Sequence, residues 1–223
     1  LIDMALPSNQ IPRVYADTGI ELNLIRNFVK SKSLKDNRIK IINPSNSIRE
    51  VLERDGYPMK SKAHSEFIAR YQKSGKLKSV RAYLGEEPGK NWSPQKSCPQ
   101  ALKYHFTDEF TLNVSDKCCV NLKEKPVAKW AKENKRPISI VGVMASEGGR
   151  RVTAKCIVFD GKGNLNKFQP LAPLTKAWEN WFIDAYNVEI CDIYKPPYNF
   201  DRTGCKGCPF NPHLQRELDT LEK

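Results

Sequence analysis

The sequence has no apolar run long enough to cross a membrane. Its longest uncharged stretch rich in apolar side chains is the nine residues from Pro137 to Ala145, whereas a membrane-spanning helix needs about 20. The first residues, Leu1 to Leu6, show neither the basic start nor the apolar core of a secretory signal peptide. Internal repeats and low-complexity blocks are absent as well. These absences exclude a transmembrane span and lead us to expect a cytoplasmic protein.

Acidic residues are too few to balance the basic ones. The chain has 37 Lys and Arg against 25 Asp and Glu, which gives a formal net charge of +12. A surplus of this size attracts polyanions, such as nucleic acid, nucleotide phosphates, sulfate esters or an acidic protein. With 39% hydrophobic and 28% charged residues, the composition is that of a globular protein and excludes disorder as its main state.

Strand-like and helix-like segments alternate along the chain. Short apolar stretches predict strands at 14–16, 39–42, 137–143 and 152–159, and helical spacing or capping residues predict helices at 20–30, 47–54, 126–132 and 173–186. Residues 73–96 are rich in Lys, Gly, Ser and Pro, which indicates a mobile basic loop. Such alternation is typical of an α/β domain with a mainly parallel, Rossmann-like sheet and helices on both faces.

Four of the seven cysteines form two pairs, Cys118-Cys119 and Cys205-x-x-Cys208. Without a secretory signal, a disulfide framework is disfavoured, and the thiols are available for metal binding or redox chemistry. Adjacent cysteines chelate one ion poorly, but each can bind a different iron of a cluster. The pattern therefore favours a 4Fe-4S cluster over a structural zinc ion or a metal-free role.

Two segments are candidates for binding phosphate. Asp17-Thr18-Gly19 follows the first strand, where Gly19 allows a tight turn and Thr18 is expected to cap the next helix. The segment Glu147-Gly148-Gly149-Arg150-Arg151 follows the strand expected to be most buried, and Arg151 has the planar fork that grips a phosphate. A solvated hairpin is the alternative for the second segment.

Taken together, these motifs resemble those of the phosphoadenosine phosphosulfate (PAPS) reductase family, within the adenine nucleotide alpha hydrolase (ATP-pyrophosphatase-like) superfamily. The resemblance extends over most of the chain. It rests on Tyr15 to Glu21, Gly56 to Lys62 with Ser65, Asp116 to Cys119 with Lys125 and Pro126, Gly142 to Arg151, and Arg202 to Phe210. The two cysteine pairs are similar to those that hold a 4Fe-4S cluster in adenylylsulfate reductases and in a sulfur-transfer protein of DNA phosphorothioation.

The chain departs from this family pattern in three places. The family's Ser-Gly-Gly-x-Asp-Ser phosphate loop is absent, so we expect a single domain over residues 1–223 that lacks its N-terminal strand and phosphate loop. Met144 stands where the family usually has an arginine, which removes one expected anion contact. Residues 210–223 contain no cysteine, which disfavours the reductases' thiosulfonate chemistry.

The resemblance implies an enzyme that acts on an adenine nucleotide or on a nucleotide-activated sulfur compound beside a 4Fe-4S cluster. Lys117 is expected to orient the substrate next to the cluster thiolates. Two reactions fit: reduction of adenylyl or phosphoadenylyl sulfate, with a thiol donor protein as partner, or ATP-dependent sulfur transfer to a nucleic acid. The alternative from another class is a non-catalytic, metal-stabilised nucleic-acid-binding protein that uses the basic loop as its contact surface.

Overall fold

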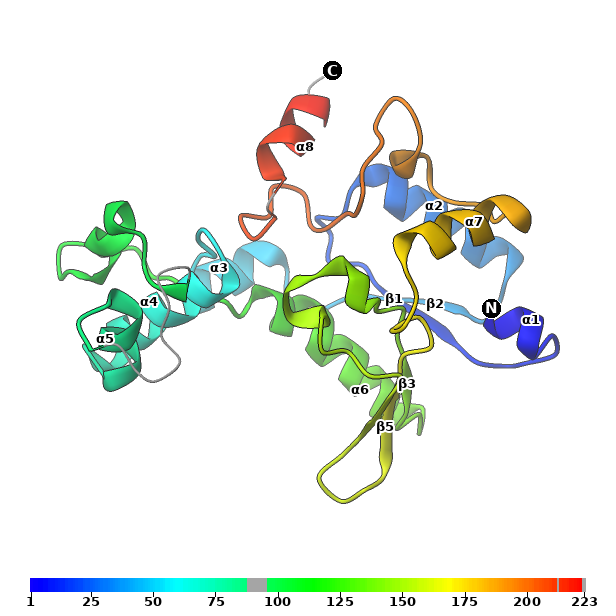
Figure 1. Ribbon diagram of the computed structural model, residues 1–223, viewed down its shortest axis with the longest axis horizontal. Helices are drawn as coiled ribbons and strands as arrows, with labels where there is room; N and C mark the ends of the chain where they lie inside the picture. The colour runs from blue at the N-terminus through cyan, green and yellow to red at the C-terminus, as the bar shows by residue number, and fades with distance from the viewer. Residues whose placement is uncertain (88–95, 212, 222–223) are drawn as a thin grey trace. The chain divides into compact units, whose positions relative to one another are not determined.

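The chain forms two compact units in the computed structural model, which describes residues 1–87, 96–211 and 213–221. Unit 1 consists of Leu1–Val127 and Asp192–Lys223, and unit 2 of Ala128–Cys191. The sequence analysis expected a single domain. Each unit mixes helices with a small sheet, so the α/β class is confirmed (Figure 1). No helix in the described residues has the length and apolar character needed to span a bilayer.

Unit 1 begins with a parallel pair of strands. A short helix, α1 (Ile2–Ala5), comes first in the chain. Strand β1 (Arg13–Ala16) then pairs with β2 (Ile39–Ile42), and α2 (Asn23–Lys35) connects the two strands. A parallel pair needs such a crossover, because the chain must return to the starting end of the sheet. The two strands confirm the sequence prediction, whereas the first long helix begins three residues later than expected.

Helix α3 (Ile48–Asp55) shows how local signals set the ends of an element. The Ser47 hydroxyl accepts a hydrogen bond from the Glu50 backbone N–H, and the Glu50 carboxylate accepts one from the Ser47 N–H. This capping box satisfies two N–H groups that the first turn would otherwise leave unpaired. At the other end Gly56 has a φ of 106°, which ends the helix.

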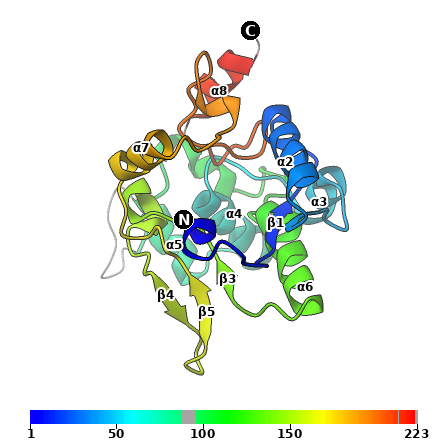
Figure 2. The same ribbon diagram turned by 90° about the vertical axis from the view of Figure 1, so that its right-hand side faces the viewer.

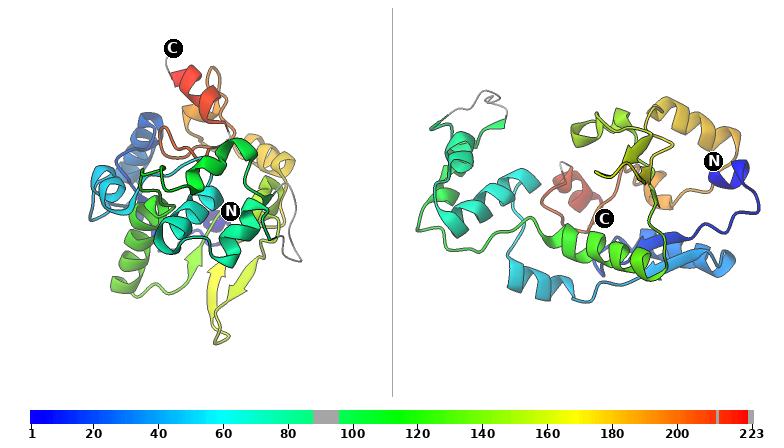
Figure 3. Two further views of the ribbon diagram at one scale, coloured as in Figure 1. Left: turned by 90° about the vertical axis from the view of Figure 1, so that its left-hand side faces the viewer. Right: turned by 90° about the horizontal axis from the view of Figure 1, so that it is seen from below.

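A helical region follows, made of α4 (Lys62–Ser74), α5 (Lys78–Leu84) and the 3-10 helix η2 (Gln100–Phe106). Figure 3 shows α4 and α5, coloured cyan to green, packed against each other. Their shared core includes Ile68, Val80, Leu84 and Phe106. The expected loop at 73–96 is therefore wrong for 78–84, because Val80 and Leu84 lie on one buried face of a helix. Residues 88–95 of that loop lie outside the described part.

The helical region is tied to the segment before the first cysteine pair. Tyr57 forms a parallel bridge with Val114, with hydrogen bonds from Tyr57 N to Asn113 O (2.8 Å) and from Ser115 N to Tyr57 O (3.1 Å). A π-helical turn, η3 (Val120–Glu124), then leads into α6 (Lys125–Glu133). The predicted helix at 126–132 is confirmed. Unit 1 closes with the 3-10 turn η6 (Asp192–Tyr194) and helix α8 (Leu214–Leu221).

Unit 2 contains a three-stranded sheet with the order β3-β5-β4. Strand β3 (Ser139–Ile140) is parallel to β5 (Leu165–Phe168), and β4 (Ile157–Phe159) pairs with β5 as an antiparallel hairpin (Figure 2). The expected buried strand at 137–143 is wrong in length and in burial, since Ile140 is 37% and Val141 38% exposed. Apolar content indicates burial only where other elements cover the strand, and these side chains remain uncovered.

Helix α7 (Lys176–Ala185) begins where its cap predicts. The Thr175 hydroxyl accepts a hydrogen bond from the Trp178 backbone N–H at 3.2 Å. The turn of the β4–β5 hairpin is also built locally, because the Asp160 carboxylate accepts from the backbone N–H groups of Lys162 and Asn164. Both features are readable from sequence, since they involve residues only two to four positions apart.

Substituting Gly56 tests the contact between the helical region and the segment that leads to the cysteines. Gly56 and Gly75 each follow a helix with a backbone that favours glycine, so alanine strains both by about 1 to 3 kcal/mol. A Cβ on Gly56 would also lie 2.8 Å from Asn113 O, whereas one on Gly75 meets nothing within 4 Å. We expect Gly56→Ala to lower the unfolding free energy by at least about 1 kcal/mol more than Gly75→Ala. Equal losses in urea unfolding would contradict this close approach.

Candidate functional site

The Asp17-Thr18-Gly19 turn begins as soon as β1 ends. Asp17 N donates to Ile42 O at 2.9 Å, which extends the pairing of β1 with β2 by one residue. One carboxylate oxygen of Asp17 then accepts from Gly19 N at 3.0 Å, and the other accepts from Arg26 Nε at 3.1 Å. Gly19 has a φ of 82°, the left-handed region that glycine tolerates. Asp17 therefore shapes the turn and binds α2 through Arg26.

Thr18 does not cap the next helix, which corrects the sequence prediction. Helix α2 starts at Asn23 without a side-chain cap. The Thr18 hydroxyl, on a side chain that is 3% exposed, donates instead to Glu21 Oε1 at 3.1 Å. Glu21 is itself buried. A buried carboxylate requires compensating partners, and Thr18 is one of them.

The Glu21 segment is bound to the second cysteine pair, almost 190 positions away in sequence. Glu21 and Cys205 form an antiparallel bridge, and Lys206 N donates to Ile20 O at 2.7 Å. Cys205 Sγ lies 3.9 Å from Glu21 Oε1 and 4.0 Å from Thr18 Oγ1. In the Cys205-x-x-Cys208 loop, Cys208 N donates to Cys205 O at 3.1 Å. The turn at Asp17 and this cysteine loop are thus one structural unit.

Lys123 supplies positive charge beside Glu21 and Cys205. Its ammonium lies 2.8 Å from Glu21 Oε1. Burial opposes the charge of Lys123, but the hydrogen bond to Glu21 and the nearby Cys205 raise its pKa above the usual value. Lys123 reaches Glu21 from the π-helical turn that follows Cys119, and such turns occur often at functional sites.

Sequence reasoning missed Lys123. It follows Cys119 by four positions, which are neighbours on a helix surface. The signal was therefore present in a helix that starts at Cys118, but the predicted helix began only at residue 126. Lys117, which was expected beside the thiolates, is 59% exposed and lies 3.6 Å from Asp116 Oδ1.

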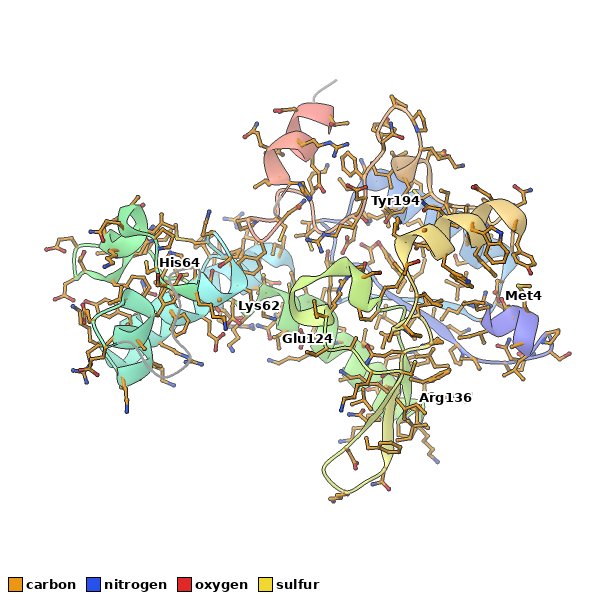
Figure 4. All side chains as sticks on the ribbon, in the orientation of Figure 1. Met4, Lys62, His64, Glu124, Arg136 and Tyr194 are labelled. Carbon is orange, nitrogen blue, oxygen red and sulfur yellow. The ribbon has the colours of Figure 1, made fainter. Side chains whose placement is uncertain are left out.

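Cys118 and Cys119 form a coupled pair of half-buried thiols. A hydrogen bond from Cys118 lowers the pKa of Cys119 to about 6, aided by the positive charges of Lys62 and Lys123. The same hydrogen bond and burial raise the pKa of Cys118. Cys119 is thus the member of the pair that loses its proton more readily. Figure 4 shows Lys62 near Glu124, with Lys62 Nζ 3.9 Å from Glu124 Oε1.

The two cysteine pairs interact electrostatically, because a thiolate in one pair raises the pKa of a thiol in the other. The Cys208 thiolate would raise the pKa of Cys118, and Cys119 has the same effect on Cys208, although burial is the main cause of the raised pKa at Cys208. Burial likewise raises the pKa of Cys205. Within the described residues, no three Cys, His, Asp or Glu side chains converge as ligands of a single metal ion. The four sulfurs share one neighbourhood without closing around one point.

The second candidate for phosphate binding lies in unit 2. Two 3-10 turns, η4 (Ala145–Glu147) and η5 (Gly149–Arg151), flank Gly148, and the Arg151 guanidinium forms an ion pair with the Glu147 carboxylate. Gly148 and Gly149 both have positive φ values, 76° and 59°. Met144, at the position of the family's arginine, is buried. The structure thus places Asp17, Thr18, Gly19 and the four cysteines in unit 1. Glu147 and Arg151 belong to unit 2.

Comparison with known proteins identifies the family. The model of the phosphoadenosine phosphosulfate reductase domain matches residues 1–211. The chain belongs to this family. The fold is similar to the crystal structure of phosphoadenylyl-sulfate (PAPS) reductase from Candida auris in a phosphate complex, with a TM-score of 0.50 and 13% identity over 92% of this chain and 73% of that one. No curated protein matches the sequence. Membership in the PAPS reductase family confirms the family predicted from the sequence, and the 4Fe-4S pattern of the cysteines stays a prediction.

The Lys123–Glu21 pair predicts a measurable coupling energy. In a double-mutant cycle of Lys123→Met and Glu21→Gln, we expect about 1 to 2 kcal/mol of coupling, because Glu21 is buried while Lys123 is 37% exposed. The control cycle uses Lys195 and Asp192, which are 3.0 Å apart but 46% and 74% exposed. That pair should couple by about 0.5 kcal/mol or less. Equal coupling in both cycles would show that Lys123 is an ordinary surface cation.

Proposed function

We propose that the protein is an enzyme that binds an adenine nucleotide or nucleotide-activated sulfur compound beside a 4Fe-4S cluster. The observation that carries the proposal is the bridge between Glu21 and Cys205, with Lys123 in contact with both residues. It joins the turn after β1, where α/β sheets bind ligands, to the cysteines. Family membership supports the same class of substrate.

The cysteines suit a cluster better than a single metal ion. A structural zinc ion needs four ligands at the corners of one tetrahedron, and two adjacent cysteines such as Cys118 and Cys119 chelate a single ion poorly. A 4Fe-4S cluster takes one thiolate at each iron, so its ligands are spread out. Cys118, Cys119, Cys205 and Cys208 would be those ligands, and Lys62 and Lys123 would offset their charge.

Residues of this chain would hold the substrate by charge and hydrogen bonds. Lys62 and Lys123 place positive charge beside Cys119, and the backbone of the Asp17-Thr18-Gly19 turn offers N–H groups. Lys117, which precedes the first cysteine pair and lies 3.6 Å from Asp116, would contact the anionic end of the substrate. Arg151, in unit 2, is a separate candidate that would bind a phosphate or sulfate in place of its present partner Glu147. When bound, the cluster would supply a charged centre beside the anionic end of the substrate.

Two reactions remain within this proposal. Reduction of adenylyl or phosphoadenylyl sulfate releases sulfite and the nucleotide monophosphate or bisphosphate, and consumes two electrons from an external thiol donor. Sulfur transfer uses ATP to activate a nucleic acid for attack by a sulfur donor. The net charge of +12 favours the second reaction, because a basic protein attracts the phosphates of a nucleic acid.

The cluster proposal predicts the metal content of the protein. After anaerobic purification we expect brown protein with about four iron and four sulfide per chain. Cys205→Ser should lose most of this iron, because Cys205 would be a ligand. Cys156→Ser is the matched control, since Cys156 is exposed and outside both pairs, and it should keep the iron. Stoichiometric zinc without iron in the unaltered protein would contradict the cluster and favour the metal-stabilised nucleic-acid-binding protein.

The binding proposal predicts which cations the substrate contacts. Titration calorimetry with adenylyl sulfate should show a ten- to hundredfold weaker affinity for Arg151→Ala and for Lys117→Ala, because each removes a charge-assisted contact of about 1.5 to 3 kcal/mol. Lys129→Ala is the control, since Lys129 is 69% exposed and its nearest carboxylate, Glu133, is 3.9 Å away. Unchanged affinity in the first two variants, with iron content intact, would place the anion site elsewhere.

A further inference from the structure

Two of the chain's three histidines lie buried side by side in the helical region. His64 on α4 is 1% exposed and His105 on η2 is 2% exposed. A hydrogen bond of 2.9 Å joins His64 Nε2 to His105 Nδ1, and a second of 2.8 Å joins His64 Nδ1 to Tyr83 Oη on α5. Figure 4 labels His64 in this region. The His64–His105 pair thus connects all three helices of the region.

This arrangement suits two neutral rings. In a hydrogen bond between two imidazoles, one nitrogen must accept, so both rings cannot be protonated while the bond persists. His105 Nε2 is buried without a hydrogen-bond partner. A proton added to the pair would therefore leave an imidazolium in a space lined by apolar and aromatic groups, including the Phe106 and Phe110 rings.

In the described part of the chain, no negatively charged group near the pair would compensate the charge of an imidazolium. From the turn before α4, the charged group that acts on His64 is the cation Lys60. From α5, the titratable group that contacts His64 is the phenol of Tyr83. Burial raises the pKa of Tyr83 to about 12, so the phenol stays neutral. Asp108, which follows η2, instead accepts a hydrogen bond from Tyr71. No carboxylate in the described residues pairs with either ring.

We propose that the His64–His105 pair is an acid-sensitive latch, which holds α4, α5 and η2 together while both rings are neutral and releases them when a proton binds. Burial and the neighbouring His105 lower the pKa of His64 from 6.5 to about 4. An exposed histidine binds a proton from about pH 6.5 downward. When the helices separate, the two histidines become exposed and bind protons that they do not bind while buried. The stabilising effect is full above pH 6.5 and declines as the pH falls towards 4.

Separation of the three helices would also affect the segment that leads to Cys118, because hydrogen bonds connect α4 to it. Ser65, one residue beyond His64, holds Met59 by two hydrogen bonds of 2.8 Å: the Met59 N–H donates to the Ser65 hydroxyl, and the Ser65 hydroxyl donates to the Met59 carbonyl. Met59 follows Tyr57, whose bridge to Val114 leads towards Cys118. Acid would therefore loosen the support of the first cysteine pair. The proposal stands on the helical region alone and does not depend on the enzyme's reaction.

Hydrogen exchange of the full chain, measured from pH 7 to 5, tests the latch. After correction for the intrinsic pH dependence of exchange, the opening constant of α4, α5 and η2 should rise by about tenfold per pH unit below pH 6 for each proton taken up. Residues 13–42, which contain no histidine, should show no such rise. The range stops at pH 5 because the carboxylates titrate below it.

Variants connect the effect to the pair. His105→Gln should reduce the pH dependence in the helical region to that of one remaining buried histidine, His64, whereas His213→Gln, at the exposed third histidine, should leave it unchanged. An equal rise in both regions of the unaltered protein, or an unchanged pH dependence in His105→Gln, would overturn the latch. If His105→Gln fails to fold, the comparison of the two regions in the unaltered protein decides alone.

Discussion

A buried carboxylate, Glu21, is the charge around which the candidate site is arranged. Removing a carboxylate from water costs several kcal/mol unless ion pairs and hydrogen bonds replace the lost hydration. Glu21 obtains an ammonium from Lys123 at 2.8 Å and a hydroxyl from Thr18 at 3.1 Å. Thr18 belongs to the turn after β1, whereas Lys123 comes from a distant part of the sequence, so the charge of Glu21 is compensated only when that turn and the helix after Cys119 are both in place.

The cysteine pairs are consequently fixed by two different kinds of contact. Cys205 is held by backbone pairing with Glu21, and Lys206 adds a hydrogen bond to Ile20. Cys118 lies instead at the start of a helix whose preceding segment pairs with Tyr57, next to the glycine that contacts Asn113. Lys123 joins the two arrangements, because it belongs to the helix of the first pair and binds the carboxylate beside the second.

Features set by near neighbours in the sequence were predicted best. The helices expected at 47–54 and 173–186 are present, and their starts are fixed by hydrogen bonds that Ser47 and Thr175 accept over three positions. Features that depend on distant packing were predicted less well. Thr18 was expected to cap a helix, but Glu21 takes its hydroxyl. The apolar run at 137–143 was expected to be a buried strand, although its burial depends on covering elements that no local pattern reveals.

Some of the lysines that contribute to the net charge of +12 lie near the cysteines, where they interact with groups of the protein itself. Burial raises the pKa of Cys205 and Cys208, so as free thiols both stay protonated, and Lys123 then serves chiefly Glu21. Any centre that binds these sulfurs deprotonates them and adds negative charge around the same ammonium. Lys62 and Lys123 already act on Cys119. With such a centre bound, part of the positive surplus would offset thiolates within the protein, and only the remainder would be free to attract a nucleotide or a nucleic acid.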